Sequence, residues 1–486
     1  MEWIEQEMAS AALGDQRLNR RLRQILERCF AQPMASLKAS MRGWTEMVAA
    51  YRFFDHKKVT VESILAPHRA AILERAKPHG RVLVIQDTTE IDYTQKKELK
   101  GTGPLSTDTR RGFFAHTQYV ATAQGLPLGV WHSDIYARTL DPKRPDKKND
   151  RKQRTPEERE SYRWVEGYLQ ACELAEAVPE LQVISQADRE GDIYDVFAER
   201  EGRLDKGQAA PHWLIRCNHP ERKLETPPHE SPEAEGSALV ADKLLERVKN
   251  SPLLGTRSFH VKNRVQNKKI DGKRKKVKRP ARNVTLEVRV AKIELRPPWR
   301  KGTKLPPVTI SVVLAQEIDP PADDEAICWI LLTSLEVSDL AAANEILDLY
   351  LVRWEIEVFH RVLKTGCRVE DLQLKEEQRV QPAIALYMIV AWRVLYLMKL
   401  GRECPDLPCE MVFEREEWQA IVVLVKGREA LGGTPPSLRE MVRMVAGFGG
   451  FAARKSDGEP GAESMWIGLT RLRDFAFCWQ RFGPPA

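Results

Sequence analysis

The sequence lacks the features of a membrane-spanning or secreted protein. Its longest uninterrupted run of apolar residues, 383–392, is ten residues long and ends at Arg393, whereas a helix that crosses a bilayer needs about 20. The first residues, MEWIE, lack the basic, apolar and small-residue succession of a secretion signal. We therefore expect neither a membrane protein nor a secreted one.

The cysteines are not spaced as in metal-binding or redox motifs. The eight cysteines contain no CxxC pair, and the closest two are Cys404 and Cys409. This argues against a zinc ribbon or a thioredoxin-like site and favours reduced, buried thiols. No internal repeat and no sustained heptad is visible, which argues against a coiled-coil scaffold.

What the chain does contain is an ordinary globular composition with a modest excess of positive charge. Its 486 residues predict roughly three domains. Apolar residues make up 42% and charged residues 30%, enough for a sizeable core. The net charge of +7 is weak evidence for an anionic partner by itself, because the distribution of charge matters more than its sum.

The first part of the chain reads as helical. Asp15 is placed to cap a helix over 16–29, whose apolar stripe is Leu18, Leu22, Ile25 and Leu26. The same helix is crowded with basic residues: Arg17, Arg20, Arg21 and Arg23. A solvated helix surface and a DNA-contacting helix are both open readings of this pattern.

From residue 81 onward the pattern predicts a mixed α/β protein. Strands are expected at 82–85, 113–123, 128–136, 181–187 and 213–217, and further antiparallel strands at 257–265, 283–294, 308–316 and 326–333. The Asp271–Gly272 pair is a turn signal. Residues 340–375 return to helix. The expected domains are 1–72 (helical), 73–217 (α/β core), 218–338 (β insertion), 339–375 (final core helix) and 376–486 (helical).

Two acids follow buried apolar strands. Asp87 ends the run that begins at Val82, and Asp188 ends the run over 181–187. A carboxylate at the end of a central strand has rigid support and is exposed at the sheet edge, where α/β sheets place functional groups. The alternative for each is an ordinary turn or helix cap.

A third acid stands in a polar helical stripe. At about 100° per residue, Tyr350, Arg353, Glu357 and Lys364 fall within about 60° of one another. Solvated salt bridges would explain them on an exposed helix. However, apolar residues flank the stripe on both sides, so we expect the helix to be substantially buried and the stripe to meet a partner.

Three carboxylates without a His or Cys cluster suit hard cations such as Mg²⁺, with Mn²⁺ as a substitute, rather than zinc. Two such ions can clamp the attacking and leaving oxygens of a phosphodiester displacement. Arg353 and Lys364 are then natural phosphate binders.

A strongly basic segment lies in the β insertion. Between Arg257 and Arg282 there are twelve Lys or Arg residues and one acid, Asp271. A β-ribbon with a cationic tip at 267–279, including Lys273 and Arg274, suits contact with DNA phosphates. A solubilising charged loop is the plainer alternative.

At these residues the sequence resembles the DDE transposases of the insertion-sequence-four group. The helix matches the signature Y-x2-R-x3-E-x6-K, and residues 188–192 match a D-R-E-x-D block. Residues 87–89 match a D-T-T block, and the likeness extends to 10–15, 50–53 and 328–334.

The resemblance implies an RNase H-like catalytic core with an antiparallel β insertion, flanked by N- and C-terminal helical domains. It implies that Asp87, Asp188 and Glu357 are the catalytic, metal-binding triad. It also implies that Tyr350, Arg353 and Lys364 handle the transposon end, that Trp329 stacks on a flipped base, and that Arg216 contacts DNA. Arg17, Arg20 and Arg21 would then help the N-terminal helices to recognise the end.

The implied activity is cut-and-paste transposition. Its steps are hydrolysis to free a 3′-OH, hairpin formation, hairpin opening and joining to target DNA. The implied partners are double-stranded DNA, as transposon ends and target, and a second copy of the chain in a homodimer formed through 376–486. The implied location is the cytoplasm, at the bacterial nucleoid.

Two other readings stay open. A metal-dependent RNase H-like nuclease that cuts without joining would keep the triad. A non-catalytic DNA-binding regulator descended from a transposase would keep the basic surfaces and need no chemistry.

Overall fold

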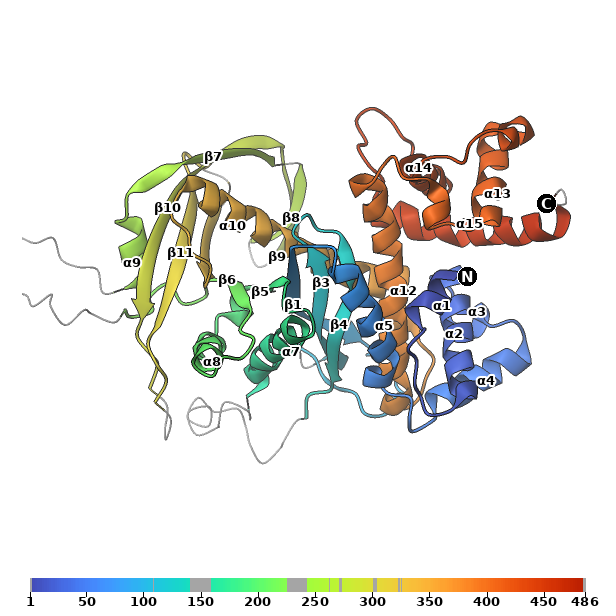
Figure 1. Cartoon of the computed structure of the whole chain (residues 1–486), viewed down its shortest axis with the longest axis horizontal. Helices are drawn as coiled ribbons and strands as arrows, with labels where there is room; N and C mark the ends of the chain where they lie inside the picture. The colour runs from blue at the N-terminus through green and yellow to red at the C-terminus, as the bar shows by residue number, and fades with distance from the viewer. Residues whose placement is uncertain are drawn as a thin grey trace, which may run out of the picture. The chain divides into compact units, whose positions relative to one another are not determined.

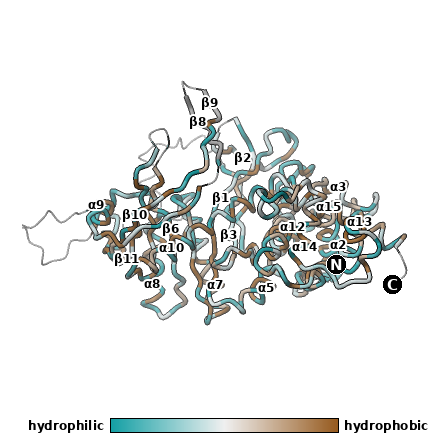
Figure 2. The backbone as a smooth tube through the Cα atoms, turned by 90° about the horizontal axis from the view of Figure 1, so that it is seen from above, coloured by the Kyte–Doolittle hydropathy of each residue, from teal (hydrophilic) through white to brown (hydrophobic). Residues whose placement is uncertain are grey.

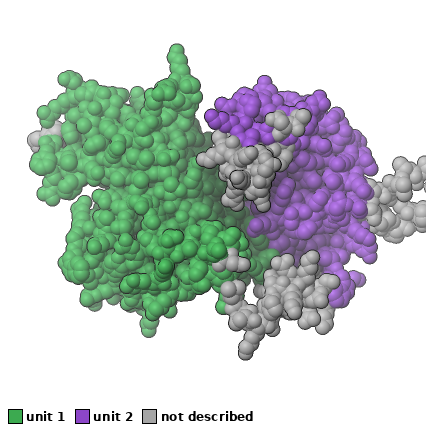
Figure 3. Space-filling view, turned by 180° about the vertical axis from the view of Figure 1, so that it is seen from behind, with its two compact units in different colours: residues 1–183, 352–486 green, residues 184–351 purple. Residues whose placement is uncertain are grey.

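The computed structural model describes residues 2–107, 109–139, 159–224, 243–261, 263–270, 273–299, 304–321, 324 and 326–483, and it describes the side chains of that set outside 264–276. The chain forms two compact units. Unit 1 comprises Met1–Val183 and Val352–Ala486, and unit 2 comprises Ile184–Leu351 (Figure 3). Each unit is described by itself below.

Unit 1 begins with short helices around an apolar centre. They are α1 (Glu2–Glu7), α2 (Gln16–Ala31), α3 (Leu37–Ser40), α4 (Trp44–Phe54) and α5 (Val61–Ala76). The Asp15 carboxylate caps α2 by accepting the Arg17 N–H at 2.7 Å, as predicted. Leu22, Ile25 and Leu26 are fully buried, so the predicted apolar stripe is the packed face of this helix.

The strands of unit 1 form a largely antiparallel sheet. They are β1 (Arg81–Asp92), β2 (Gly103–Pro104), β3 (Arg111–Thr122) and β4 (Pro127–Tyr136), in the order β2-β3-β1 with β4 also on β3. The helix that follows is α7 (Arg163–Ala177), preceded by the turn η1 (Glu160–Tyr162). Side chains from β1, β3, β4, α5 and α7 share one apolar cluster that includes Val84, Val120 and Leu174. This cluster gives β1 a rigid support.

Helix α12 (Glu377–Glu403) is the central helix of unit 1. It contacts β4, α5, α2, α4, α14 and α15 (Figure 1), and Trp392 Nε1 donates to the Pro127 carbonyl at 3.0 Å. By length and composition α12 would be able to cross a membrane, but 89% of its most apolar stretch is buried inside the protein. The run-length argument did not count this helix as a candidate span because Arg393, itself buried, interrupts the apolar run.

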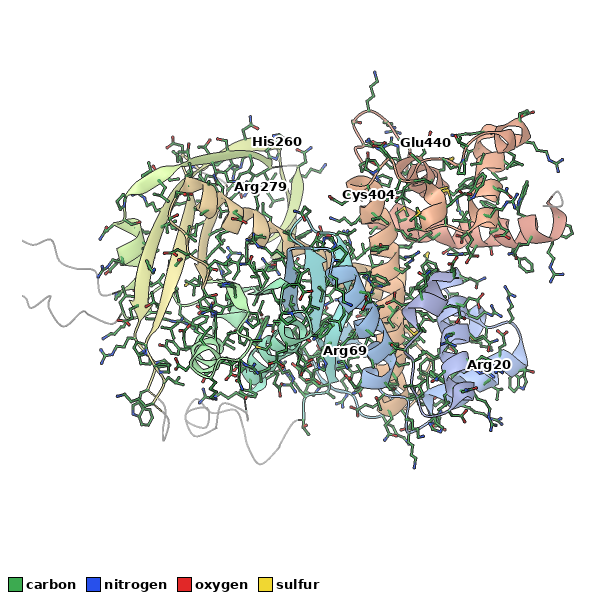
Figure 4. All side chains as sticks on the ribbon, viewed as in Figure 1. Arg20, Arg69, His260, Arg279, Cys404 and Glu440 are labelled. Carbon is green, nitrogen blue, oxygen red and sulfur yellow. The ribbon has the colours of Figure 1, made fainter. Side chains whose placement is uncertain are left out.

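The C-terminal part of unit 1 is helical, as expected. Its elements are η4 (Val369–Asp371), η5 (Cys409–Met411), α13 (Arg415–Lys426), η6 (Arg428–Gly432), α14 (Leu438–Phe448) and α15 (Ala462–Phe482). Helix α14 begins with a capping box between Ser437 and Glu440. Helices α13, α14 and α15 pack on one another, and they form the group that carries Glu440 in Figure 4.

Unit 2 contains one sheet in the order β5-β6-β12-β11-β10-β7. Its strands are β5 (Gln182–Ala187), β6 (His212–Arg216), β7 (Leu253–Val261), β10 (Arg282–Leu295), β11 (Val308–Glu317) and β12 (Cys328–Thr333). The unit boundary falls within β5. Strands β5 and β6 are parallel, whereas the other pairs, from β6 to β7, are antiparallel. The helices of unit 2 are η2 (Arg189–Gly191), α8 (Tyr194–Asp205), α9 (Leu244–Lys249) and α10 (Leu340–Val352).

A separate two-stranded hairpin carries the basic segment. Strands β8 (Arg264–Ile270) and β9 (Lys273–Arg279) pair only with each other among the described strands, in antiparallel register from Arg264–Arg279 to Ile270–Lys273. The hairpin extends away from the sheet of the unit (Figure 2). The predicted Asp271–Gly272 turn lies outside the described residues.

Mixed α/β architecture is confirmed, but two local predictions are wrong. Strand β1 continues to Asp92, so Asp87 lies within it and does not end it; only the fully apolar part of the strand stops before Gln86. The predicted continuous helix over 340–375 is broken. Helix α10 ends at Val352, α11 spans Trp354–Arg361, and the next turn, η3 (Val362–Gly366), is π-helical.

The break changes the spacing of the polar stripe. Cys367 N–H donates to the Val362 carbonyl at 2.8 Å, which is the i to i+5 bond of a π turn. A spacing of 100° per residue therefore does not hold as far as Lys364. The four residues are divided among α10, the break at Arg353, α11 and η3, so they do not lie on one continuous α-helix.

Candidate functional site

Strand β1 holds Asp87 on a rigid backbone. Asp87 lies opposite Thr117 of β3 in the antiparallel register. Its carboxylate accepts the Thr88 N–H at 2.9 Å, and its side chain is 20% exposed. The carboxylate is therefore supported from the sheet yet accessible to a ligand.

Helix α11 presents Glu357 together with Arg353. The Arg353 Nη2 group donates to Glu357 Oε1 in an i,i+4 ion pair. Arg353 is 14% exposed at its side chain and Glu357 is 35% exposed. The two charged side chains therefore pair with each other, as the salt-bridge reading of this stripe expects.

His360 connects these two elements, and sequence reasoning missed it. Its Nδ1 lies 3.8 Å from Asp87 Oδ2, and the ring is buried one turn beyond Glu357. Burial, followed by the charges of Lys364 and His116, lowers the pKa of His360 to about 3. The signal available in the sequence was the i,i+3 spacing from Glu357, which the search for carboxylates passed over.

Lys364 points its ammonium at the backbone of β1. Its Nζ donates to the Glu90 carbonyl at 3.4 Å. Arg110 forms ion pairs with two acids of the same part of the strand, Glu90 at 2.6 Å and Asp92 at 2.8 Å. Burial opposes ionisation of Glu90, but hydrogen bonds from Ser106 and the Arg110 charge outweigh it and lower the pKa of Glu90.

Asp188 is in unit 2, directly after β5. Its carboxylate accepts the Glu190 N–H at 2.8 Å and caps η2. Asp192, at the other end of the D-R-E-x-D block, is buried and accepts the N–H groups of Asn218 and His219. It also pairs with Arg222 at 2.6 Å. Asp192 is thus a structural anchor, whereas Asp188 lies at a strand end, as predicted.

Three further predicted residues lie in unit 2. The Tyr350 side chain is buried. Trp329 of β12 is half-buried and stacks on Phe259, with ring centroids 6.2 Å apart. Arg216 ends β6, and its Nη2 donates to the Cys328 carbonyl at 3.4 Å. Trp329 and Arg216 therefore lie on neighbouring strands.

The predicted DNA-facing residues differ in their surroundings. Arg17 and Arg20 of α2 are exposed, and Arg20 lies among the N-terminal helices in Figure 4. Arg21 is half-buried and donates to Gln24 at 2.9 Å. The backbone of Lys273 and Arg274 runs in β9, but their side chains lie outside the described residues.

Several residues of the basic run serve the fold instead. Arg257 pairs with Asp348, and Arg282 pairs with Glu317. Arg279 is buried and lies 3.5 Å from Asp324. The count of positive charges in the sequence therefore overstates the charge available to DNA.

The donor chemistry fits a divalent cation, but the described residues do not display a finished metal site. Among them, no group of three or more His, Cys, Asp or Glu side chains is arranged to hold an ion. The accessible oxygens of Asp87 and Glu357 are the ligands that Mg²⁺ and Mn²⁺ prefer. The metal triad stays a prediction.

Comparison with protein-family models gives three matches along the chain. Residues 1–59 match a model described as transposase DNA-binding, residues 205–393 match a transposase DDE domain, and residues 389–480 match a transposase Tn5 dimerisation domain. The chain has the domains of a DDE transposase. The matches place a DNA-binding domain in the N-terminal helices and a dimerisation domain in the C-terminal helices.

The matched ranges include some of the candidate site residues and leave out others. The match to the DDE domain includes Glu357, His360 and Lys364 but begins after Asp87 and Asp188. The DNA-binding match covers α1 to α4, including Arg17, Arg20 and Arg21. The dimerisation match begins within α12, the helix that also packs on the sheet of unit 1.

Proposed function

We propose that this transposase performs cut-and-paste transposition, as the transposase of transposon five does, on an RNase H-like core. The observation that carries the proposal is the approach of the Glu357 helix to Asp87 of β1, with His360 3.8 Å from the Asp87 carboxylate. Two acids from segments about 270 residues apart are placed on adjoining elements of unit 1, inside a chain with all three transposase domains.

In this proposal Asp87, Asp188 and Glu357 hold two Mg²⁺ ions, for which Mn²⁺ substitutes. When bound, the ions would activate the attacking oxygen and stabilise the leaving oxygen of a phosphodiester. The chain contributes rigid placement: β1 supports Asp87, and the turn capped by Asp188 supports the second carboxylate. Glu357 is partly exposed on α11, and its arginine partner would turn to a phosphate when DNA binds.

Arg353 and Lys364 bind the phosphates next to the cut. The Arg353 guanidinium already lies against a carboxylate, and two oxygens of a tetrahedral phosphate accept from the same planar guanidinium. Lys364 adds a point charge close to β1. Tyr350 belongs to the same proposed set, and it is buried close to the end of α10.

The remaining contacts position the DNA. Trp329 stacks on a base flipped out of the duplex, a contact worth roughly 1–3 kcal/mol, and Arg216 on the neighbouring strand contacts the backbone. Lys273 and Arg274 of the hairpin follow phosphates, and Arg17, Arg20 and Arg21 recognise the transposon end. Arg21 has the weakest support because it is half-buried.

The reaction would proceed in four steps within a homodimer. Water first cleaves one strand and frees a 3′-OH, which then attacks the opposite strand and closes a hairpin. A second hydrolysis opens the hairpin, and the 3′-OH finally joins to target DNA. Each step breaks one phosphodiester bond, and in the second and fourth a new one forms.

Incubation with a duplex that carries the element's own terminus tests this function. With Mg²⁺ we expect a nick and then a hairpin-sized product on a denaturing gel, followed by joined products when target plasmid is added. Asp188→Ala should bind the duplex and leave it intact. Asp205→Asn, an exposed acid on α8, should behave as wild type.

The outcome separates the alternatives. Cleavage without joined products would identify a nuclease. Bound but persistently intact DNA with the wild-type chain would identify a non-catalytic regulator.

A further inference from the structure

The buried imidazole of His360 has one ring nitrogen for which the described part of the chain supplies no hydrogen bond. Its ring is buried, and its Nε2 atom makes no hydrogen bond within the part of the chain that the structure describes. A buried, unpaired polar atom costs about 1–3 kcal/mol. An apolar side chain at this position in α11 would avoid that cost, so the imidazole is not there for packing alone.

The geometry defines which ring nitrogen faces the acid. Nδ1 lies 3.8 Å from Asp87 Oδ2, and Nε2 is the atom that lacks a partner. A proton on Nε2 would leave a buried donor unpaired and turn the Nδ1 lone pair toward a carboxylate, which is doubly unfavourable. A proton on Nδ1 instead places an N–H dipole toward the carboxylate.

A second imidazole supports the residue next to Asp87. His116 Nδ1 lies 2.8 Å from Thr88 Oγ1, and its Nε2 lies 3.3 Å from Gln86 Oε1. The side chains on both sides of Asp87 are therefore held by His116, and His360 is the ring that faces Asp87 itself. The separation of 3.8 Å is too long for a hydrogen bond, so a small rotation of the carboxylate would complete the contact.

We propose that His360 is a positioning residue, whose Nδ1–H orients the Asp87 carboxylate and ties it to the helix that carries Glu357. This inference rests on the proposed function, since it assigns His360 to the metal-binding acids. Groups that hydrogen-bond to metal-ligating carboxylates orient them, and their removal typically costs about 10–100-fold in metal affinity or activity. In this role His360 acts through Asp87 and not directly on the substrate.

Two isosteres distinguish the ring nitrogens. The amide of Asn reaches the position of Nδ1, and the longer Gln reaches the position of Nε2. We expect His360→Asn to need nearly the wild-type Mg²⁺ concentration for half-maximal cleavage of the end duplex. His360→Gln and His360→Leu should need roughly tenfold more or worse.

A second measurement avoids catalysis altogether. The rise in unfolding midpoint on adding Mn²⁺, without DNA, reports metal binding to the folded chain. It should be preserved in His360→Asn and reduced in His360→Gln. The matched control is His68→Asn, which alters another buried imidazole, hydrogen-bonded to Glu7 and to the Val130 N–H; it should lower the midpoint without changing the Mn²⁺-induced rise.

Equal metal requirements in His360→Asn and His360→Gln would overturn the inference, as would a wild-type requirement in His360→Leu. Because Asn and Gln are both polar and of similar volume, this comparison holds even if the leucine variant fails to fold. A wild-type chain with neither metal-dependent cleavage nor an Mn²⁺-induced rise would instead reject the proposed function.

Discussion

At the scale of single residues, the buried carboxylate of Glu7 ties the N-terminal helix to the rest of unit 1. It accepts from His68 Nδ1 and pairs with Arg75 at 2.6 Å. Arg75 also lies over the Trp392 ring, 4.2 Å from its centroid. Burial alone would raise the pKa of Glu7, but attraction to His68 and Arg75 outweighs it and lowers that pKa from 4.5 to about 2.

The direction of this shift fixes how stability depends on pH. Because the folded-state pKa is lowered, the carboxylate contributes stability above about pH 4.5 and loses that contribution as the pH falls toward 2. Glu7→Gln should cost about 3 kcal/mol of unfolding free energy at pH 7, and the difference from wild type should narrow between pH 4.5 and 2. Urea unfolding of both proteins between pH 7 and pH 2 measures this difference in free energy.

The control is Glu74→Gln, an exposed acid paired with Lys77. It should change the free energy of unfolding by less than about 0.5 kcal/mol at every pH. A Glu7→Gln difference that stays constant from pH 7 to pH 3 would show that the charge of Glu7 is not what stabilises the contact.

At the scale of elements, the sequence anticipated most strands and helices but not where regular structure bends. The Asp15 cap and the packed stripe of α2 follow from local chemistry, so they were predictable. The length of β1 was not, because its pairing with β3 extends it through the polar residues Asp87–Asp92. The break at Arg353 carries no composition signal, since residues 340–361 contain no Pro or Gly. Gly366 ends the π turn at Val362–Gly366, but a glycine there is equally typical of an ordinary helix end.

In the candidate site, too, residue types could be predicted from the sequence, whereas contacts between distant segments could not. Carboxylates at Asp87, Asp188 and Glu357 were visible as residue types in strand and helix contexts. His360 was not, because its role depends on which strand α11 packs against. The pairing of Arg279, Arg257 and Arg282 with acids of unit 2 was equally hidden, since those acids are distant in sequence.

The segment after the π turn stores local strain. Arg368 adopts a left-handed conformation, with φ of 52° and ψ of 41°, which is unfavourable for a residue with a Cβ. Its exposed ion pair with Asp371 contributes little. Arg368→Gly should therefore leave the unfolding free energy unchanged or raise it by up to about 1 kcal/mol, as measured by urea denaturation.

Arg361→Gly gives the matched comparison, because Arg361 is exposed and has a right-handed helical backbone. At this position the substitution should lower the free energy of unfolding by about 1 kcal/mol. An equal loss of unfolding free energy in Arg368→Gly and Arg361→Gly would contradict the claim that the backbone of Arg368 is strained.

At the scale of the whole molecule, one polypeptide carries matches to transposase DNA-binding, DDE and dimerisation domains. Helix α12 contains the end of the DDE match and the start of the dimerisation match. It packs on β4 and α5 and also on α14 and α15. The C-terminal helices are thus continuous with the core of unit 1.

DNA binding should depend on salt through counterion release. The slope of log affinity against log salt falls by about 0.9 for each phosphate contact that is lost. Replacing Arg17 and Arg20 together by Ala should reduce the slope by up to about 2, measured by fluorescence anisotropy with an end duplex. Lys206→Ala, an exposed residue just after α8, is the control and should leave the slope unchanged; a wild-type slope in the double variant would remove α2 from the interface.

The most direct test asks whether Asp87, Asp188 and Glu357 each bind the catalytic ion. Replacing each acid by Cys supplies a softer thiolate ligand, which disfavours Mg²⁺ and accepts Mn²⁺ more readily. We predict that all three variants fail to cleave an end duplex with Mg²⁺ and recover measurable cleavage with Mn²⁺. Full activity with Mg²⁺ in any one of them would contradict the assignment of that acid as a ligand.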